Sequence, residues 1–206
     1  MTFSNSSFLG WALITSGVFW ILQLIFVTLM YTYNPLFGAW SDFSNAVTVI
    51  LMLPLVWALY GLTKEQSQSL SLLAALLVVA GILANAVPSI LIIIDRMSFA
   101  ETLPPIIAGF GAIGLGLLLS FLLARAGGDL PSKVVLWGIV IGLGLFSFAG
   151  LLTVDMYSIF TGGGMGGFWS NPLVYPALTI GMVAYFAYPV WAIWLGRLVL
   201  GGKLIP

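Results

Sequence analysis

Six long apolar stretches occupy most of this 206-residue chain, and nearly all of its charged residues lie between them. Hydrophobic residues make up 61% of the sequence and charged residues only 6%, whereas a soluble domain carries about 25% charged residues. A water-soluble fold cannot bury so much apolar surface, so lipid is expected to be the solvent for most of the chain. The sequence therefore predicts a membrane protein with the lipid bilayer as its first partner.

Each apolar stretch is long enough to cross a bilayer as a helix, which takes about 20 residues. The stretches are continuously apolar rather than alternating, and this disfavours a β-barrel. The expected spans are Phe8–Met30, Phe43–Leu62, Leu70–Ile94, Pro105–Ala124, Val134–Val154 and Leu173–Leu200. The prediction is an all-α, polytopic membrane protein with six transmembrane helices, forming a single transmembrane domain over residues 1–206. Pro189 is expected to tilt, kink or shorten the last helix.

The two ends of the expected bundle differ in their number of basic residues. If consecutive spans alternate in direction, one side receives five basic residues and the other receives only Arg96. The five are Lys64, Arg125, Lys133, Arg197 and Lys203. By the positive-inside rule the richer side is cytoplasmic, so both termini are expected in the cytosol. The expected location is the cell (inner) membrane, with a multi-pass topology.

The chain has no cysteine and no histidine, and its formal net charge is zero. Disulfides, thiolate nucleophiles and histidine ligands therefore have no side chain to form them. Haem and histidine-ligated metals or pigments are disfavoured, no cofactor is predicted, and nucleic acid is not expected as a partner. Bound lipid, carotenoid or quinone stays open, because these molecules need only apolar grooves and aromatic side chains.

A pattern in the second span recurs in the last one. The segment Pro54–Gly61 resembles Pro189–Gly196 after a one-residue shift. This recurrence favours three tandem helical hairpins related by an axis along the membrane normal. A chance match between apolar segments is the alternative interpretation.

The polar junction between the second and third spans carries a family resemblance. The segment Leu59–Lys64 (LYGLTK), followed by Ser69–Ala75 (SLSLLAA), resembles the corresponding junction of an uncharacterised family of bacterial six-helix integral membrane proteins. The resemblance covers a small part of the chain. It implies the six-helix architecture and no activity, because that family has no assigned function.

Few polar side chains interrupt the spans, so the exceptions are candidates for a binding site. In the deduced orientation they gather in the outer half of the bundle. The candidate ligand-binding residues are Asn85, Gln23, Asn45, Thr48 and Asp155. Asn85 is favoured because Pro88 removes a backbone hydrogen bond and loosens the turn beside the amide.

The functional interpretation of these residues is an outward-facing polar pocket for a cation, an amine or a lipid headgroup. Asp42, Asp95 and Asp155 would surround its mouth. The alternative interpretation is hydrogen bonding between helices, which stabilises a membrane bundle without any ligand.

Glycines and aromatic residues suggest where other surfaces make contact. The fourth and fifth spans contain Gly111-x-x-Gly114 and Gly142-x-Gly144, which favour close packing against each other or against a partner subunit. The two long outer connections carry the aromatic residues expected to contact a partner, namely Trp40, Phe168 and Trp169. Other membrane subunits or self-association are thus the expected protein partners.

These features bear on three classes of function. The favoured one is a non-catalytic structural or accessory subunit of a larger membrane complex, since no catalytic constellation is visible. The alternative is a small transporter or a ligand- or lipid-binding membrane protein that uses the outward-facing pocket. An intramembrane enzyme acting on lipid would need a carboxylate dyad, a Ser–Lys pair or a metal cluster, so the chain is not expected to be an enzyme.

Overall fold

The computed structural model describes residues 7–128, 130–160 and 174–202, with the backbone alone for 99–100, 151–160 and 174–178. These residues form helices, and no strand occurs among them. The helices are α1 (Ser7–Thr32), α2 (Phe37–Ile50), α3 (Leu53–Thr63), α4 (Gln68–Ile93), α5 (Phe99–Gly127), α6 (Ser132–Phe160) and α8 (Val174–Leu200).

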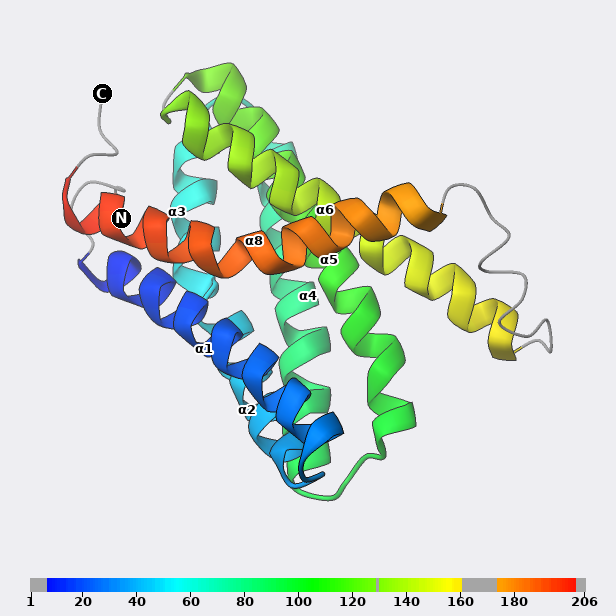
Figure 1. The fold of residues 1–206 in the computed structure, drawn as a ribbon. Coiled ribbons are helices and arrows are strands. Elements are labelled where there is room, and N and C mark those ends of the chain that lie inside the picture. The colour runs from blue at the N-terminus through cyan, green and yellow to red at the C-terminus, as the bar shows by residue number, and fades with distance from the viewer. Residues whose placement is uncertain (1–6, 129, 161–173, 203–206) are drawn as a thin grey trace.

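Within the described residues, six helical spans are long and apolar enough to cross a membrane. The pair α2 and α3 forms the second of them, over Phe37–Thr63. The expected all-α, six-span fold is thereby confirmed. Each neighbouring pair of spans in the chain packs together, and α8 returns to pack on α1, so that the contacts between spans form a closed ring. Figure 1 shows α8 crossing in front of the bundle, with its C-terminal end near the start of α1.

The second span is broken, although the sequence predicted one continuous helix there. α2 ends at Ile50 and α3 begins at Leu53. The cause is Pro54, which has no N–H to give to the carbonyl of Ile50 and whose ring crowds that carbonyl. The chain turns instead through Leu51 and Met52, and Met52 donates its N–H to the Val49 carbonyl at 3.1 Å. In contrast, Pro189 lies inside a helix that continues to Leu200.

α5 begins at Phe99, six residues before the expected start at Pro105. A capping box explains the earlier start: the Ser98 side chain accepts a hydrogen bond from the Glu101 N–H, and the Glu101 carboxylate accepts one from the Ser98 N–H at 2.8 Å. Such a reciprocal cap satisfies two backbone donors that a helix start leaves free. Pro104 and Pro105 lie inside α5, beyond the N–H groups that a helix start leaves free, so the carbonyls of Ala100 and Glu101 each lack their usual helical donor.

α4 carries most of its large aliphatic side chains outward, and it buries mainly small or polar side chains together with Val78 and Ile82. Its exposed residues include Leu72, Leu76, Leu83, Val87 and Ile90. Its buried residues include Ser71, Ala74, Gly81, Asn85 and Ser89. A soluble helix shows the opposite distribution, with its apolar face toward the core. Small residues at helix contacts and aliphatic residues outside are typical of helices surrounded by lipid.

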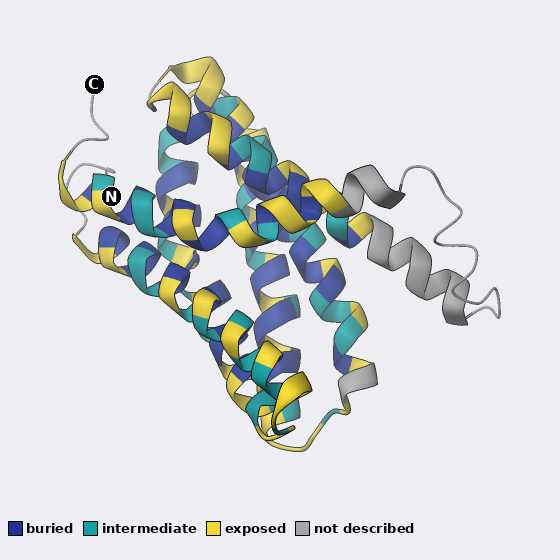
Figure 2. Ribbon diagram, viewed as in Figure 1, coloured by how far each residue is buried: buried dark blue, intermediate teal, exposed yellow. Residues whose placement is uncertain are grey.

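The buried inner faces of the helices (dark blue in Figure 2) form a largely aliphatic core that contains a cluster of aromatic rings. The Trp20 ring of α1 lies at its centre, with its centroid 5.8 Å from that of Phe110, 4.8 Å from Tyr185 and 4.5 Å from Tyr188. On the other side of Tyr188, the Trp191 ring packs on Phe121 with centroids 5.7 Å apart. Aromatic residues of α1, α5 and α8 thus fill the middle of the ring.

Candidate functional site

A cavity of about 550 Å³ opens at the end of the bundle that carries the turn between α1 and α2. Four helices and this turn form its wall. The lining residues are Gln23, Val27, Met30 and Tyr31 from α1, Pro35 from the turn, Gly38, Ala39, Ser41, Asp42 and Asn45 from α2, Ile92 and Ile93 from α4, and Leu103 and Ile106 from α5. We call this space the α1/α2 cavity.

Two buried amides line the α1/α2 cavity. Gln23 is 8% exposed and Asn45 is 3% exposed. The side-chain carbonyl oxygens of both residues have no hydrogen-bond partner in the described part of the chain. A buried acceptor without a donor costs about 1–3 kcal/mol, so a donor that reached either oxygen would recover part of that cost.

Asn45 is held in place by α4. Its Nδ2 donates to the Ser89 Oγ at 2.9 Å, and both side chains are buried. Ser89 follows Pro88, and both residues lie inside α4. The bond fixes the amide plane and leaves the Asn45 Oδ1 as the free acceptor.

Asp42 supplies the charge of the α1/α2 cavity. It is half-buried and lies one turn before Asn45 on α2, so both side chains share one face of the helix. It is the one charged residue among the described residues that line the cavity. The polar groups here are therefore a carboxylate, two amides whose oxygens lack a partner among the described residues, and the hydroxyls of Tyr31 and Ser41, against aliphatic walls.

Thr48 belongs to a different polar cluster, at the contact of three helices. The Ser16 Oγ lies 2.7 Å from the Tyr188 hydroxyl and 3.1 Å from the Thr48 carbonyl oxygen, to which it donates. The Thr48 hydroxyl donates to the Ser16 carbonyl at 3.5 Å. These contacts tie α1, α2 and α8 together, as expected from interhelical hydrogen bonding. The structure therefore separates Thr48 from Gln23 and Asn45.

Asn85 also lies away from the α1/α2 cavity. It is fully buried, and its Nδ2 donates to the Gly81 carbonyl at 3.0 Å, one turn earlier in α4. Its amide lies against Gly109 of α5, where a β-carbon would overlap it. The amide fills the contact between α4 and α5, and its role in ligand binding stays a prediction.

Three of the remaining expected site residues fall in α6 or between α6 and α8 in the sequence, and the fourth, Trp40, lies in α2. Asp155 lies in α6, where the backbone alone is described. Phe168 and Trp169 lie outside the described residues. Trp40 is described: its ring is 57% exposed and its centroid lies 6.2 Å from that of Phe26.

The sequence had placed Asp42 at the mouth of a pocket, but it gave no reason to single out Ser89. A serine next to a proline in an apolar helix was the available signal. Among the described residues, no three carboxylate, histidine or cysteine side chains cluster in a way that could hold a metal ion.

The helices define an all-α protein whose six spans are those of a multi-pass membrane protein. Comparison of the chain with protein-family models, with curated proteins and with solved structures finds no match. The resemblance of the Leu59–Lys64 junction to a bacterial six-helix family stays a prediction.

Proposed function

We propose that this chain is a non-catalytic multi-pass membrane protein that binds a small organic cation in the α1/α2 cavity. The observation that carries the proposal is that Asp42 lines the cavity together with Gln23 and Asn45, whose buried carbonyl oxygens have no hydrogen-bond partner among the described residues. The proposal covers a binding protein and a small transporter that uses the same site. The positive-inside rule supports a cavity open to the outside and both termini in the cytoplasm of a bacterial inner membrane.

The lining chemistry favours an organic ammonium over other ligands. A primary ammonium carries three N–H donors and no acceptor, which complements a carboxylate and two amide oxygens. An anion would meet the Asp42 charge with no basic side chain among the described lining residues to balance it. A bare metal ion usually takes about six or more oxygen ligands, whereas aliphatic side chains such as Ile92 and Ile106 make up much of this wall.

The proposal is tested by thermal unfolding of the purified full-length protein in mild detergent. Cyclohexylammonium is compared with cyclohexanol, which has the same ring and no charge. We expect the ammonium to raise the melting temperature in a saturable way and the alcohol to have little effect. The Asp42→Asn variant is expected to bind the ammonium at least about tenfold more weakly, because it loses the counter-charge.

Asp95→Asn is the matched control for the charge change. Asp95 is exposed at the same end of the bundle and does not line the α1/α2 cavity. Its backbone φ is 53°, a left-handed conformation that asparagine also tolerates, so the substitution is expected to be silent. Equal ammonium binding by wild type and Asp42→Asn, or equal loss in both variants, would contradict the proposal.

An accessory subunit of a larger complex is the second candidate function. It is favoured by the exposed aromatic and aliphatic side chains around the turn between α1 and α2: Tyr31, Tyr33, Leu36 and Trp40 are 74%, 82%, 76% and 57% exposed. Exposed aromatic residues also suit a membrane interface. Stoichiometric companion chains in the same purified preparation would favour the subunit, and a lone chain that responds to the ammonium would favour the binder.

A further inference from the structure

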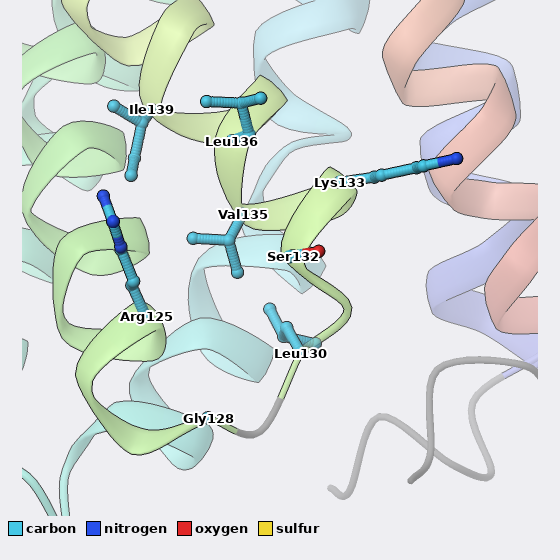
Figure 3. A pocket seen from close by; sticks show the side chains of 8 residues that line it. All are labelled: Arg125, Gly128, Leu130, Ser132, Lys133, Val135, Leu136 and Ile139. Atoms are coloured by element: carbon cyan, nitrogen blue, oxygen red, sulfur yellow. The ribbon is translucent and has the colours of Figure 1, made fainter.

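At the end of the bundle away from the α1/α2 cavity, basic side chains lie beside apolar grooves. Figure 3 shows Arg125 at the end of α5 and Lys133 at the start of α6 pointing in different directions, with the Lys133 side chain extending toward α8. Arg125 lines a cavity of about 400 Å³ between α5 and α6. Lys133 reaches a second groove, of about 410 Å³, between α6 and α8.

This second groove is lined by Lys133 and Trp137 of α6 and by Ala187, Val190, Trp191 and Trp194 of α8. We call it the α6/α8 groove. Ala187, Val190 and Trp194 follow one another at helical spacing along one face of α8, over a length of about 10 Å. Val190 is 69% exposed, so the groove is open on the side that faces lipid.

The charge of the α6/α8 groove is positive and unbalanced. Lys133 is its one charged residue among the described lining residues. The adjoining groove on α8 contains Arg197 and shares Val190 and Trp194 with it. Basic side chains therefore stand at both grooves that meet at Trp194, with no acidic side chain among the residues described there.

We propose that the α6/α8 groove binds an anionic phospholipid, with its phosphate at Lys133 and an acyl chain along Ala187 and Val190. Tryptophan is favoured at the depth of lipid headgroups, and basic pockets between membrane helices suit acidic headgroups. A free phosphate ion would leave the apolar face of α8 uncovered. A zwitterionic lipid would bring an ammonium group to a place where no described side chain is acidic. The inference is independent of the ligand in the α1/α2 cavity.

The test is native mass spectrometry of the full-length protein in mild detergent, titrated with dioleoyl phosphatidylglycerol or dioleoyl phosphatidylcholine. We expect tighter binding of phosphatidylglycerol, and about a fivefold loss of that affinity in Lys133→Gln. Lys64→Gln is the control. Lys64 is exposed between α3 and α4 and lines neither groove. Because successive spans alternate in direction, it lies on the same side of the membrane as Lys133. The affinity of Lys64→Gln for phosphatidylglycerol is expected to match wild type.

A second variant, Val190→Trp, separates the apolar contact from the charge. The new indole fills the groove while Lys133 stays in place, and the exposed position leaves the fold undisturbed. We expect it to weaken phosphatidylglycerol binding as well, with an unchanged melting temperature in lipid-free detergent. The inference is overturned if Lys133→Gln keeps the wild-type preference, if Val190→Trp binds as wild type does, or if soluble glycerol phosphate displaces the lipid at equal concentration.

Discussion

Asn85 is an uncommon kind of buried residue, because its amide is satisfied on one side only. The Nδ2 donates to the Gly81 carbonyl, while the Oδ1 has no partner in the described part of the chain. The Gly81 carbonyl is also placed to accept the usual helical bond from the N–H four residues later. If the Asn85 amide is removed, the Gly81 carbonyl keeps its helical hydrogen bond. If the amide is kept, its Oδ1 stays without a donor among the described residues.

Asn85→Leu is accordingly expected to leave the protein as stable as wild type or to stabilise it by about 1 kcal/mol. Leucine has the same branching as asparagine and no polar atom to satisfy. The measurement is the melting temperature in mild detergent, with Asn85→Asp as a variant that must be less stable because it buries a charge. A clear drop in stability for Asn85→Leu would show that the Oδ1 has a partner that remains to be found.

The sequence predicted which spans carry the polar residues but not the direction in which each side chain points. Gln23, Asn45, Thr48 and Asn85 all lie within described spans, but two line the α1/α2 cavity and two fill helix contacts. Depth follows from position within an apolar span. The rotation of each helix follows from its packing partners, and these were not readable from one sequence.

At the scale of the helices, glycine determines how closely neighbouring spans approach. A β-carbon at Gly114 of α5 would lie 2.7 Å from the Gly142 carbonyl oxygen of α6. Similar contacts pair Gly81 with Gly109 and Gly10 with Gly196. The expectation that the fourth and fifth spans pack tightly is confirmed for their contact with each other. Glycines used in this way are covered by neighbouring helices and do not offer a surface to a partner.

Gly114→Ala and Gly150→Ala are therefore expected to act in opposite directions. Both place alanine inside a helix, which alone stabilises by up to about 1 kcal/mol. The β-carbon at Gly114 meets the α6 backbone, so this variant is expected to be less stable by about 1–3 kcal/mol. No described atom lies within 4 Å of a β-carbon at Gly150. Thermal unfolding of both variants checks the difference, and equal melting temperatures would argue against close packing of α5 on α6.

The spans were predictable from hydropathy, whereas the break between α2 and α3 was missed. Pro54 was recognised only as part of a repeat, although a proline far from a helix start is itself a signal for a break. Pro88 and Pro189 show why that signal is ambiguous, since α4 and α8 continue through them. Whether a helix ends at a proline depends on what its neighbours stabilise.

At the scale of the whole molecule, the two ends of the bundle differ in charge. One end holds Asp42 beside amide oxygens in the α1/α2 cavity, and the other holds Lys133 and Arg197 beside tryptophans. The sequence predicted this difference in charge from the basic residues, most of which lie on one side if the spans alternate in direction. It supports an orientation in which the basic end faces the cytoplasm, where anionic lipid is enriched.

The orientation can be tested directly, because a chain without cysteine accepts a single reporter thiol. Tyr33→Cys and Lys64→Cys place that thiol at exposed positions in successive connections. In intact bacterial cells, a membrane-impermeant maleimide is expected to label Tyr33→Cys alone, and Lys64→Cys only after permeabilisation. Labelling of Lys64→Cys in intact cells would reverse the orientation and place the α1/α2 cavity on the cytoplasmic side.

The contact between α1 and α8 closes the ring where Gly10 meets Gly196 and Leu200. Among the described helices, α1 thus completes its packing only against α8, which is synthesised after all the others. During translation the helices made before α8 form an open arc, and the faces of α1 and α6 that pack on α8 have no partner until α8 is inserted. A ribosome that stalls before Val174 would leave a chain without α8, in which the Trp20 ring lacks the Tyr185 and Tyr188 rings that cover it in the folded protein.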